Sequence, residues 1–336
     1  MRCCSPFNTD EMKNRIVYLD LAKALAIFLV VWGHIIVCHD SEQYADKVAQ
    51  CIYSFHTAFF MYLSGFFFSF SLKKSPKKLV LEKSRQLLVP YFSWSVVMLL
   101  LINIPEGGLP NAISTVKDFV LGGWLKNYWY LKALFLYIVV TYFLVKLTRN
   151  EFIGCGLSWI LFTVLPNFSF SVIFIPFFIV GHLTKPLIEK SDSWIIIIGL
   201  AIVDVILYCF WSPAYNYTAL NMSLVPYIIR TGIGCITSML IILLLKKVFN
   251  AYTTNGSRFV SFIAYIGTIT LGIYCCHELF YSSVLWGWLQ DVIPFNYFVF
   301  IIWAVIALLA STLLIRVILK NKWTALLFMG KKLDIK

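Results

Sequence analysis

The first apolar run of the chain, residues 15–37, constrains the fold more than any other feature. It is long enough to cross a bilayer, yet it contains Asp20, Lys23 and His34. On a helix, Lys23 and His34 lie about 20° apart around the axis and roughly 16 Å apart along it, and Asp20 lies about 60° from Lys23. A charge at the bilayer centre costs at least ~2.5 kcal/mol. We therefore expect this polar side to face other helices or a polar cavity.

Apolar residues dominate the rest of the chain as well. They make up 60% of its 336 residues, whereas soluble domains rarely exceed about half. The sequence therefore predicts an all-α integral membrane protein, with a single membrane domain in residues 1–336 and about ten transmembrane helices in one bundle. The expected spans are residues 15–37, 49–72, 86–104, 128–147, 152–167, 170–188, 194–211, 224–245, 259–286 and 295–319.

Basic residues divide the segments between these spans into two classes. Of the 28 Lys and Arg residues, 22 lie in or within four residues of the N-terminal segment, the even-numbered connections and the C-terminal segment. Because cytoplasmic loops are enriched in Lys and Arg, residues 1–14 and 320–336 are predicted to be cytoplasmic. The expected location is the plasma membrane, which is the inner membrane in a bacterium. The net charge of +12 is then a topology signal, and we expect no nucleic-acid partner.

The densest basic run extends from Lys73 to Arg85 in the connection after the second span. One interpretation is orientation of the chain together with attraction to anionic membrane lipids. The other is a docking site for a cytoplasmic ligand that carries several phosphates. Both interpretations remain open from the sequence.

The connection over residues 105–127 is the longest on the predicted outer side. It is expected to be a loop, and the residues at and after its end are rich in aromatic rings: Trp124, Tyr128, Trp129 and Tyr130. An aromatic girdle at the membrane interface explains these rings. A surface on which sugars stack is the alternative.

Ionisable residues gather in the predicted outer half of the membrane. His34 lies near the outer end of the first span, and His56 lies about 12 Å below the outer surface on the second. Arg230 falls in the outer third of the eighth span. Because such residues avoid lipid, we expect them to share a cavity with polar residues of the ninth span, namely Thr270, Tyr274, His277 and Glu278. Asp204 on the seventh span is expected to be a structural partner for one of the cations.

These residue types suit acyl transfer to a hydroxyl group. A histidine with a pKa near neutrality can remove the hydroxyl proton, and nearby cations can stabilise the oxyanion. No serine stands in a nucleophile elbow, and no cysteine has an evident histidine partner. The nine cysteines also lack metal-ligand spacing, so we expect no metal. A proton-coupled exporter of a glycan or organic acid would use the same residues, and an inactive membrane scaffold is a third possibility.

Several short motifs in order resemble the acyltransferase-3 family of integral membrane acyltransferases, in particular sugar O-acetyltransferases. The family has a signature in which a basic residue, usually arginine, is followed by ten residues and then a histidine. Lys23 and His34 have this spacing and resemble the signature, with lysine at the basic position. The other matching residues are Phe55, His56, Phe60, Leu63, Ser64 and Gly65; Leu87, Leu88, Pro90 and Tyr91; Trp129 and Leu131; Phe177 and Gly181; and Gly272, Tyr274 and His277. Just before Leu87, Lys83 and Gln86 stand where the family often has arginine, and Arg85 lies between them.

The resemblance covers roughly residues 15–319 and implies the two substrates. It implies acyl-CoA, with acetyl-CoA first, as a cytoplasmic co-substrate rather than a bound cofactor. It implies a glycan or lipid-linked sugar as the acceptor, so that the product is a modified polysaccharide. It also implies that Lys23, His34 and His56 are essential.

We therefore predict an O-acyltransferase with the following roles. His34 is the general base, and His56 and His277 support it. Asp20 and Lys23 line the path by which the thioester arm enters. The further predicted substrate contacts are Arg230, Tyr274, Glu278 and Trp129, and the predicted donor contacts are Lys83 and Arg85.

Overall fold

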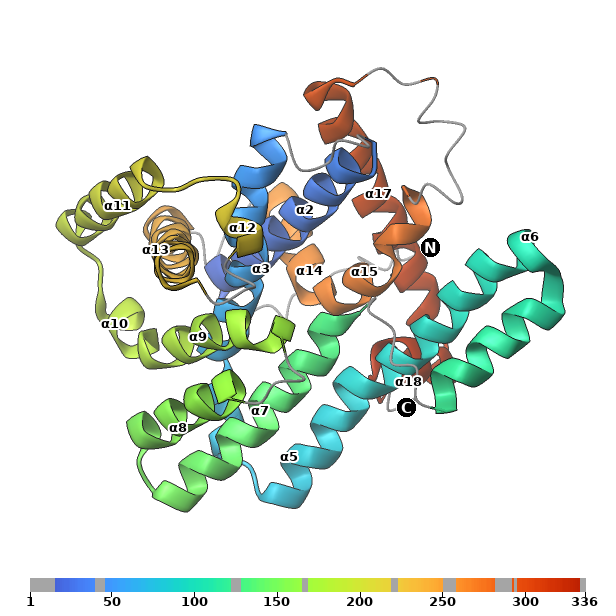
Figure 1. Cartoon of the computed structure of the whole chain (residues 1–336), viewed down its shortest axis with the longest axis horizontal. Helices are drawn as coiled ribbons and strands as arrows, with labels where there is room; N and C mark the ends of the chain where they lie inside the picture. Colours follow the sequence, from blue (N-terminus) through green and yellow to red (C-terminus); the bar gives the residue numbers. More distant parts are fainter. Residues whose placement is uncertain are drawn as a thin grey trace, which may run out of the picture.

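The structure is a computed structural model that describes residues 16–39, 46–121, 128–164, 169–218, 223–249, 258–281, 292 and 295–332. Within these residues every regular element is a helix (Figure 1). The helices are α2 (Val17–His39), α3 (Lys47–Phe66), α4 (Phe68–Leu72), α5 (Pro76–Lys83), η1 (Ser84–Leu88), α6 (Val89–Leu121), α7 (Trp129–Thr148), α8 (Glu151–Val164), α9 (Ser169–Leu183), α10 (Lys185–Lys190), α11 (Trp194–Cys209), α12 (Tyr215–Thr218), α13 (Leu224–Phe249), α14 (Arg258–Thr268), α15 (Thr270–Cys276), η4 (His277–Phe280), α17 (Tyr297–Ile318) and α18 (Lys322–Met329).

Six of the described helical segments are long and apolar enough to cross a membrane, and the bent pair formed by α14 and residues Thr270–Phe280 would be a seventh. Helices α8 and α11 and the segment Ile173–Leu183 of α9 are apolar but shorter. The chain is therefore a multi-pass membrane protein. Each of the ten predicted ranges overlaps one of these segments, whereas the count of ten crossings and the cytoplasmic position of both ends stay predictions.

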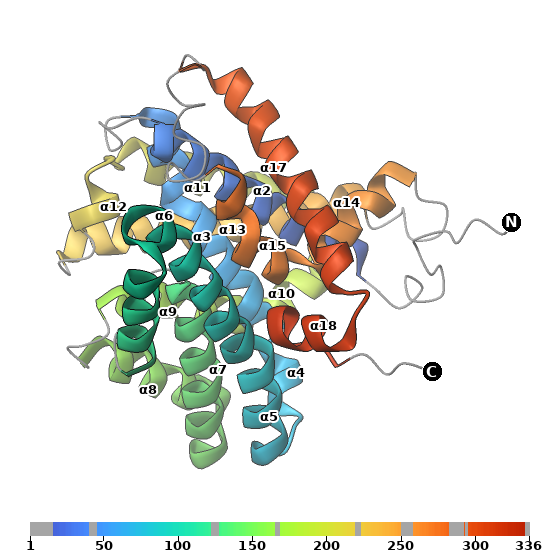
Figure 2. The same cartoon turned by 90° about the vertical axis from the view of Figure 1, so that its right-hand side faces the viewer.

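Helices α2 and α3 lie at the centre of the bundle, with α7, α9, α13, α14 and α17 around them (Figures 1 and 2). Helices α3 and α9 approach so closely that a Cβ atom on Gly65 would lie 1.8 Å from the backbone oxygen of Phe178. A Cβ atom on Gly181 would lie 2.1 Å from the backbone oxygen of Tyr62. Small residues of this kind let membrane helices pack backbone to backbone. The two motif glycines thus serve helix packing.

The segment from Pro105 onward corrects one prediction. Residues 105–127 were expected to form a loop, but helical structure continues to Leu121 and bends at Gly108, where φ is 73°. Glycine adopts positive φ without steric cost, so the chain turns there while the flanking residues remain helical. Figure 1 shows the two resulting arms of α6 side by side. Trp124 lies outside the described residues.

The predicted ninth span is not one straight helix either. It bends by 66° between α14 and residues Thr270–Phe280, and Ile269 between them lies outside regular structure. The helix then tightens into the 3₁₀ turn η4 at His277. Thr270 and Tyr274 therefore lie on the short helix α15 after the bend, and His277 begins the tighter turn.

Candidate active site

A cavity of about 360 Å³ lies in the centre of the bundle and joins residues from seven helices. It extends along α2 from Lys23 to His34, two residues that lie roughly 16 Å apart along the helix axis. We call the region at Lys23 and Phe67 the lysine end, and the region at His34, His56, Arg230 and Asn216 the histidine end. The residues that line this central cavity are Lys23, Val30, His34, Tyr53, His56, Thr57, Phe60, Leu63, Ser64, Phe67, Trp129, Tyr130, Leu134, Phe174, Asn216, Arg230, Thr270, Leu271 and Tyr274.

His34 is half-buried and lines the cavity. Its Nδ1 atom lies 3.1 Å from the hydroxyl oxygen of Tyr53. When Nδ1–H donates to this oxygen, Nε2 carries the lone pair of the neutral ring. The hydrogen bond thereby orients the ring and leaves the other nitrogen able to accept a proton from a molecule in the cavity.

His56 is buried, and its tautomer follows from its partners. Its Nδ1 lies 2.8 Å from the backbone oxygen of Ile52, which can only accept, so Nδ1 carries the proton. Nε2 is then the acceptor, and the hydroxyl of Thr57 donates to it across 3.0 Å. The ring centroids of His34 and His56 are 6.4 Å apart, and the Tyr53 ring packs 4.7 Å from His56. The two histidines are therefore linked through Tyr53, whose hydroxyl contacts His34 and whose ring packs on His56, and not by a direct hydrogen bond.

The ninth predicted span contributes through packing on this cluster. The His277 ring lies 5.6 Å from that of His34 and 5.9 Å from that of Tyr274. Neither His277 nor Glu278 lines the cavity, whereas Tyr274 does. The predicted convergence of three histidines is thus present, with His277 behind His34 instead of beside it in the cavity.

The lysine end is organised by an ion pair on one turn of α2. Lys23 Nζ lies 3.1 Å from Asp20 Oδ1, and the side chain of Asp20 is only 10% exposed. The same ammonium group lies 4.3 Å from the centroid of the Phe67 ring, a cation–π distance. Lys23 lines the cavity and Asp20 does not. The carboxylate therefore holds the lysine in place from behind.

Aromatic rings form one wall between the two ends. Trp129 begins α7 and packs 4.9 Å from Phe174, and the guanidinium of Arg230 lies 5.2 Å from that same ring. Arg230 is buried at the histidine end. Tyr130 lies 2.9 Å from the Ser64 hydroxyl. The wall is thus apolar in area, with a buried guanidinium and hydroxyl groups at defined places.

The short helix α12 contributes to the histidine end. Its Asn216 is buried and donates through Nδ2 to the side-chain oxygen of Gln50 at 2.8 Å and to its backbone oxygen at 3.0 Å. These bonds hold the segment between α11 and α13 against α3. Asp204 on α11 accepts a hydrogen bond from Thr237 at 2.8 Å, so the expected pairing with a cation is replaced by a hydroxyl contact among the described residues.

The two predicted donor contacts lie elsewhere. Lys83 is at the end of α5, where it donates to the side-chain oxygen of Gln86 at 3.2 Å, and Arg85 is in η1. Neither residue lines the central cavity. Their role in binding the donor stays a prediction.

The arrangement combines a proton acceptor, a buried cation and an apolar wall in one space. Such a site suits transfer of an uncharged acyl group between two oxygen or sulfur atoms. The family described as an acyltransferase domain (Acyl_transf_3) matches residues 16–320, nearly the whole chain. The chain belongs to the acyltransferase-3 family. No curated protein and no solved structure gives a significant match.

Family membership makes the protein a membrane acyltransferase. Several residues that line the acyltransferase cavity were not predicted from the sequence as site residues, among them Tyr53, Thr57, Phe174 and Asn216. The i−3 spacing of Tyr53 from His56 places both on one helix face and could have revealed the tyrosine. Asn216 lies in a connection, and its position depends on a contact with a residue 166 positions away, which no local pattern encodes.

Proposed function

We propose that this acyltransferase moves an acyl group, in the first place acetyl, from acyl-CoA in the cytoplasm to a hydroxyl of a cell-surface or exported glycan. The observation that supports this most directly is the continuous central cavity between Lys23 and the histidine pair. A donor that enters at the lysine end and an acceptor that enters at the histidine end would meet inside one space. The route removes the need for a separate acyl carrier across the membrane.

The proposed chemistry uses His34 as general base, in accord with its half-buried ring in the cavity. Nε2 takes the proton of the acceptor hydroxyl while the oxygen attacks the thioester carbonyl. The carbon–sulfur bond then breaks, the thiolate of CoA takes the proton from the imidazolium, and the products are an O-acyl ester and free CoA. Arg230 is the proposed stabiliser of negative charge on the carbonyl oxygen, since its buried guanidinium acts in a region of low dielectric.

The supporting residues follow from their contacts. Tyr53 holds His34 through Nδ1, and His56 with Thr57 forms a second hydrogen-bonded pair on the same wall. Trp129 and Tyr274 offer ring faces on which a sugar ring can pack. The ring of His277 lies 5.6 Å from that of His34, and His277 and the adjacent Glu278 are proposed to act through His34.

The test uses inverted membrane vesicles that contain the full chain, supplied with [¹⁴C]acetyl-CoA and membrane glycans. We expect label in an alkali-labile ester on the glycan. In His34→Ala we expect a loss of about 10²–10⁴-fold in the rate of labelling, the usual contribution of a general base. Equal amounts of inserted protein, measured by immunoblot, provide the control.

Two results would contradict the proposal. If His34→Ala labelled the glycan at the wild-type rate, His34 would not be the general base. Uptake of the glycan or of an organic acid with no ester formed would indicate transport in place of acyl transfer.

A further inference from the structure

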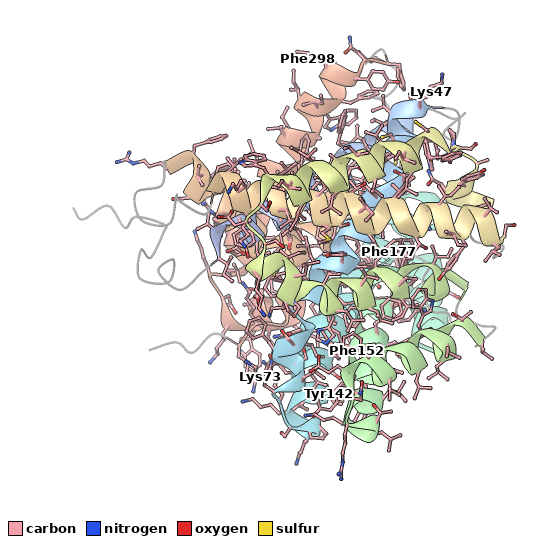
Figure 3. All side chains as sticks on the ribbon, turned by 90° about the vertical axis from the view of Figure 1, so that its left-hand side faces the viewer. Lys47, Lys73, Tyr142, Phe152, Phe177 and Phe298 are labelled. Carbon is pink, nitrogen blue, oxygen red and sulfur yellow. The ribbon has the colours of Figure 1, made fainter. Side chains whose placement is uncertain are left out.

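A second hollow, of about 510 Å³, lies beyond the lysine end of the central cavity. It is formed where α4 ends, α7 ends and α8 begins. Figure 3 shows Lys73 and Tyr142 at this end of the bundle, opposite Lys47 and Phe298. The residues that line this basic hollow are Ser69, Leu72, Lys73, Val145, Lys146, Arg149 and Glu151.

Three cations face this hollow, and none of the three forms an ion pair with another described residue. Lys73 and Lys146 contact aromatic rings at 5.8 and 5.6 Å. The one carboxylate among the described lining residues, Glu151, lies 3.0 Å from Nε2 of His182. The hollow therefore keeps an excess of positive charge for something outside the chain.

Several other lysines at this end of the bundle are engaged by partners within the chain. Lys74 pairs with Glu82 at 2.6 Å, and Lys185 donates to Ser69 at 2.7 Å. Lys246 donates to the backbone oxygens of three residues at 2.8–2.9 Å. Lys77 and Lys78 are exposed and form no ion pair with a described residue either, but they do not line this hollow, whereas Lys73, Lys146 and Arg149 converge on it.

The backbone at Arg149 provides an independent observation. This residue follows α7 in the left-handed conformation, with φ of 54°. Helices that end in this way usually have glycine or asparagine there, because a side chain with a Cβ atom is strained. The chain thus holds an arginine side chain at the rim at a cost in backbone energy.

The hollow and the central cavity adjoin the same junction between α3 and α4. Phe67 lines the central cavity and Ser69 lines the hollow, two residues further along the chain. On α7, Leu134 lines the cavity and Val145 the hollow, a rise of roughly 16 Å between them. An extended ligand can therefore place an anionic head in the hollow and a thin arm toward Lys23.

We propose that Lys73, Lys146 and Arg149 bind the phosphate groups of the acyl-CoA donor. This inference rests on the proposed function, and it assigns the nucleotide end of the donor to the basic hollow. Arginine can bind phosphate through two parallel hydrogen bonds, while lysine acts as a point charge. The pantetheine arm then passes the junction at Phe67, and the thioester reaches the central cavity. The same phosphate chemistry could come from a lipid headgroup, so the test separates the two sources.

The experiment measures binding of coenzyme A, and separately of inorganic pyrophosphate, to the full-length protein in nanodiscs. The discs contain either phosphatidylcholine alone or phosphatidylcholine with phosphatidylglycerol. The site variant combines Lys73→Gln, Lys146→Gln and Arg149→Gly, and the last change relieves the backbone strain. The matched control removes equal charge from exposed lysines that do not line the hollow, with Lys77→Gln, Lys78→Gln and Lys190→Gln.

We expect the site variant to bind coenzyme A at least about tenfold more weakly in phosphatidylcholine discs, because charge-assisted contacts to phosphate are lost. The control variant should bind like the wild type, and thermal unfolding should show that both variants are folded. An unchanged affinity in the site variant, with binding by the wild type, would overturn the phosphate site and leave the proposed function standing.

Two other results would also overturn the proposal. If the site variant differed from the wild type in coenzyme A binding only in the discs that contain phosphatidylglycerol, the three cations would be contacts for lipid headgroups. If the wild type bound pyrophosphate but not coenzyme A, the hollow would hold phosphates of another ligand, and the donor in the proposed function would be wrong.

Discussion

The central cavity and the basic hollow lie in one bundle but differ in the side chains that line them. The central cavity is lined mainly by rings and aliphatic side chains, and its polar groups form specific hydrogen bonds, as His56 does to Ile52 and Thr57. The hollow has three cations and a carboxylate that is already engaged by His182. Ordered polar groups in an apolar wall suit bond rearrangement away from water, whereas unpaired cations at the rim suit capture of a hydrated anion.

The difference teaches where charge is tolerated in a membrane protein. Inside the bundle each ionisable group needs a partner, because the surroundings cannot solvate it. Lys23 illustrates this, since it contacts both Asp20 and the Phe67 ring. At the end of the bundle, Lys73 and Arg149 are exposed to solvent and need no such pairing.

Gly65 offers the largest test, because it lies at the α3–α9 crossing, close to both spaces. Gly65→Ala would place a carbon 1.8 Å from a backbone oxygen. Because the clash is with backbone, no change of side-chain rotamer can relieve it. We expect a loss of about 3 kcal/mol of stability, the upper part of the usual range for overpacking, and damage to both spaces together. The measurements are thermal unfolding in detergent, acyl transfer and coenzyme A binding.

Gly156→Ala is the matched control for this change, since nothing lies within 4 Å of its added Cβ atom. It should leave all three measurements near the wild-type values. Normal stability in Gly65→Ala would show that the two helices do not cross as closely as described.

Lys23 tests the passage between the two spaces. Lys23→Ala removes the charge at the lysine end and leaves Asp20 without its ion pair, so we expect acyl transfer to fall about tenfold or more, the effect of losing a charged hydrogen bond. Lys23→Arg keeps the charge and the contact with the Phe67 ring and should restore most of the rate. The measurement is the rate of glycan labelling, with coenzyme A binding in parallel.

The comparison would be sharpened if Lys23→Ala slowed transfer while coenzyme A binding changed little, because the head of the donor would still be held in the hollow. Equal failure of Lys23→Ala and Lys23→Arg would instead indicate that this position requires lysine geometry and not only charge.

Tyr53→Phe is the mildest test and affects only the histidine end. It removes the hydroxyl at His34 Nδ1 and leaves the ring packing in place. We expect kcat to fall about fivefold, equivalent to the ~1 kcal/mol of one hydrogen bond, with KM nearly unchanged. A change in the pH profile of kcat should accompany the loss, because the partner of the proposed base is altered. If kcat and its pH profile stayed the same, Tyr53 would have no part in positioning His34.

The sequence predicted the membrane architecture well because hydropathy is a local property. Each expected span overlaps an apolar helix, with ends displaced by a few residues, except at residues 86–104, where the helical segment Pro76–Leu101 begins ten residues earlier. The gathering of His34, His56 and His277 also followed from local spacing, once alternate spans were given opposite directions. The family resemblance was confirmed by the match over residues 16–320.

Nonlocal packing decided the features that the sequence left open or described wrongly. The break at Ile269 depends on how α14 and α15 pack around α2 and α17, and the helical continuation beyond Pro105 depends on the bend at Gly108. Tyr53, Phe174 and Asn216 line one cavity only because three separate segments, α3, α9 and α12, come together. The basic hollow likewise joins Lys73 with Arg149, which the chain separates by 76 positions.

What the sequence by itself determined was therefore which segments enter the membrane and which polar residues cannot face lipid, since both follow from the transfer energy of single side chains. What only the tertiary structure decided was which of those residues share one space, and which cations remain unpaired. That depends on the face that each helix presents to its neighbours, and such a face is set by contacts between residues far apart in the chain.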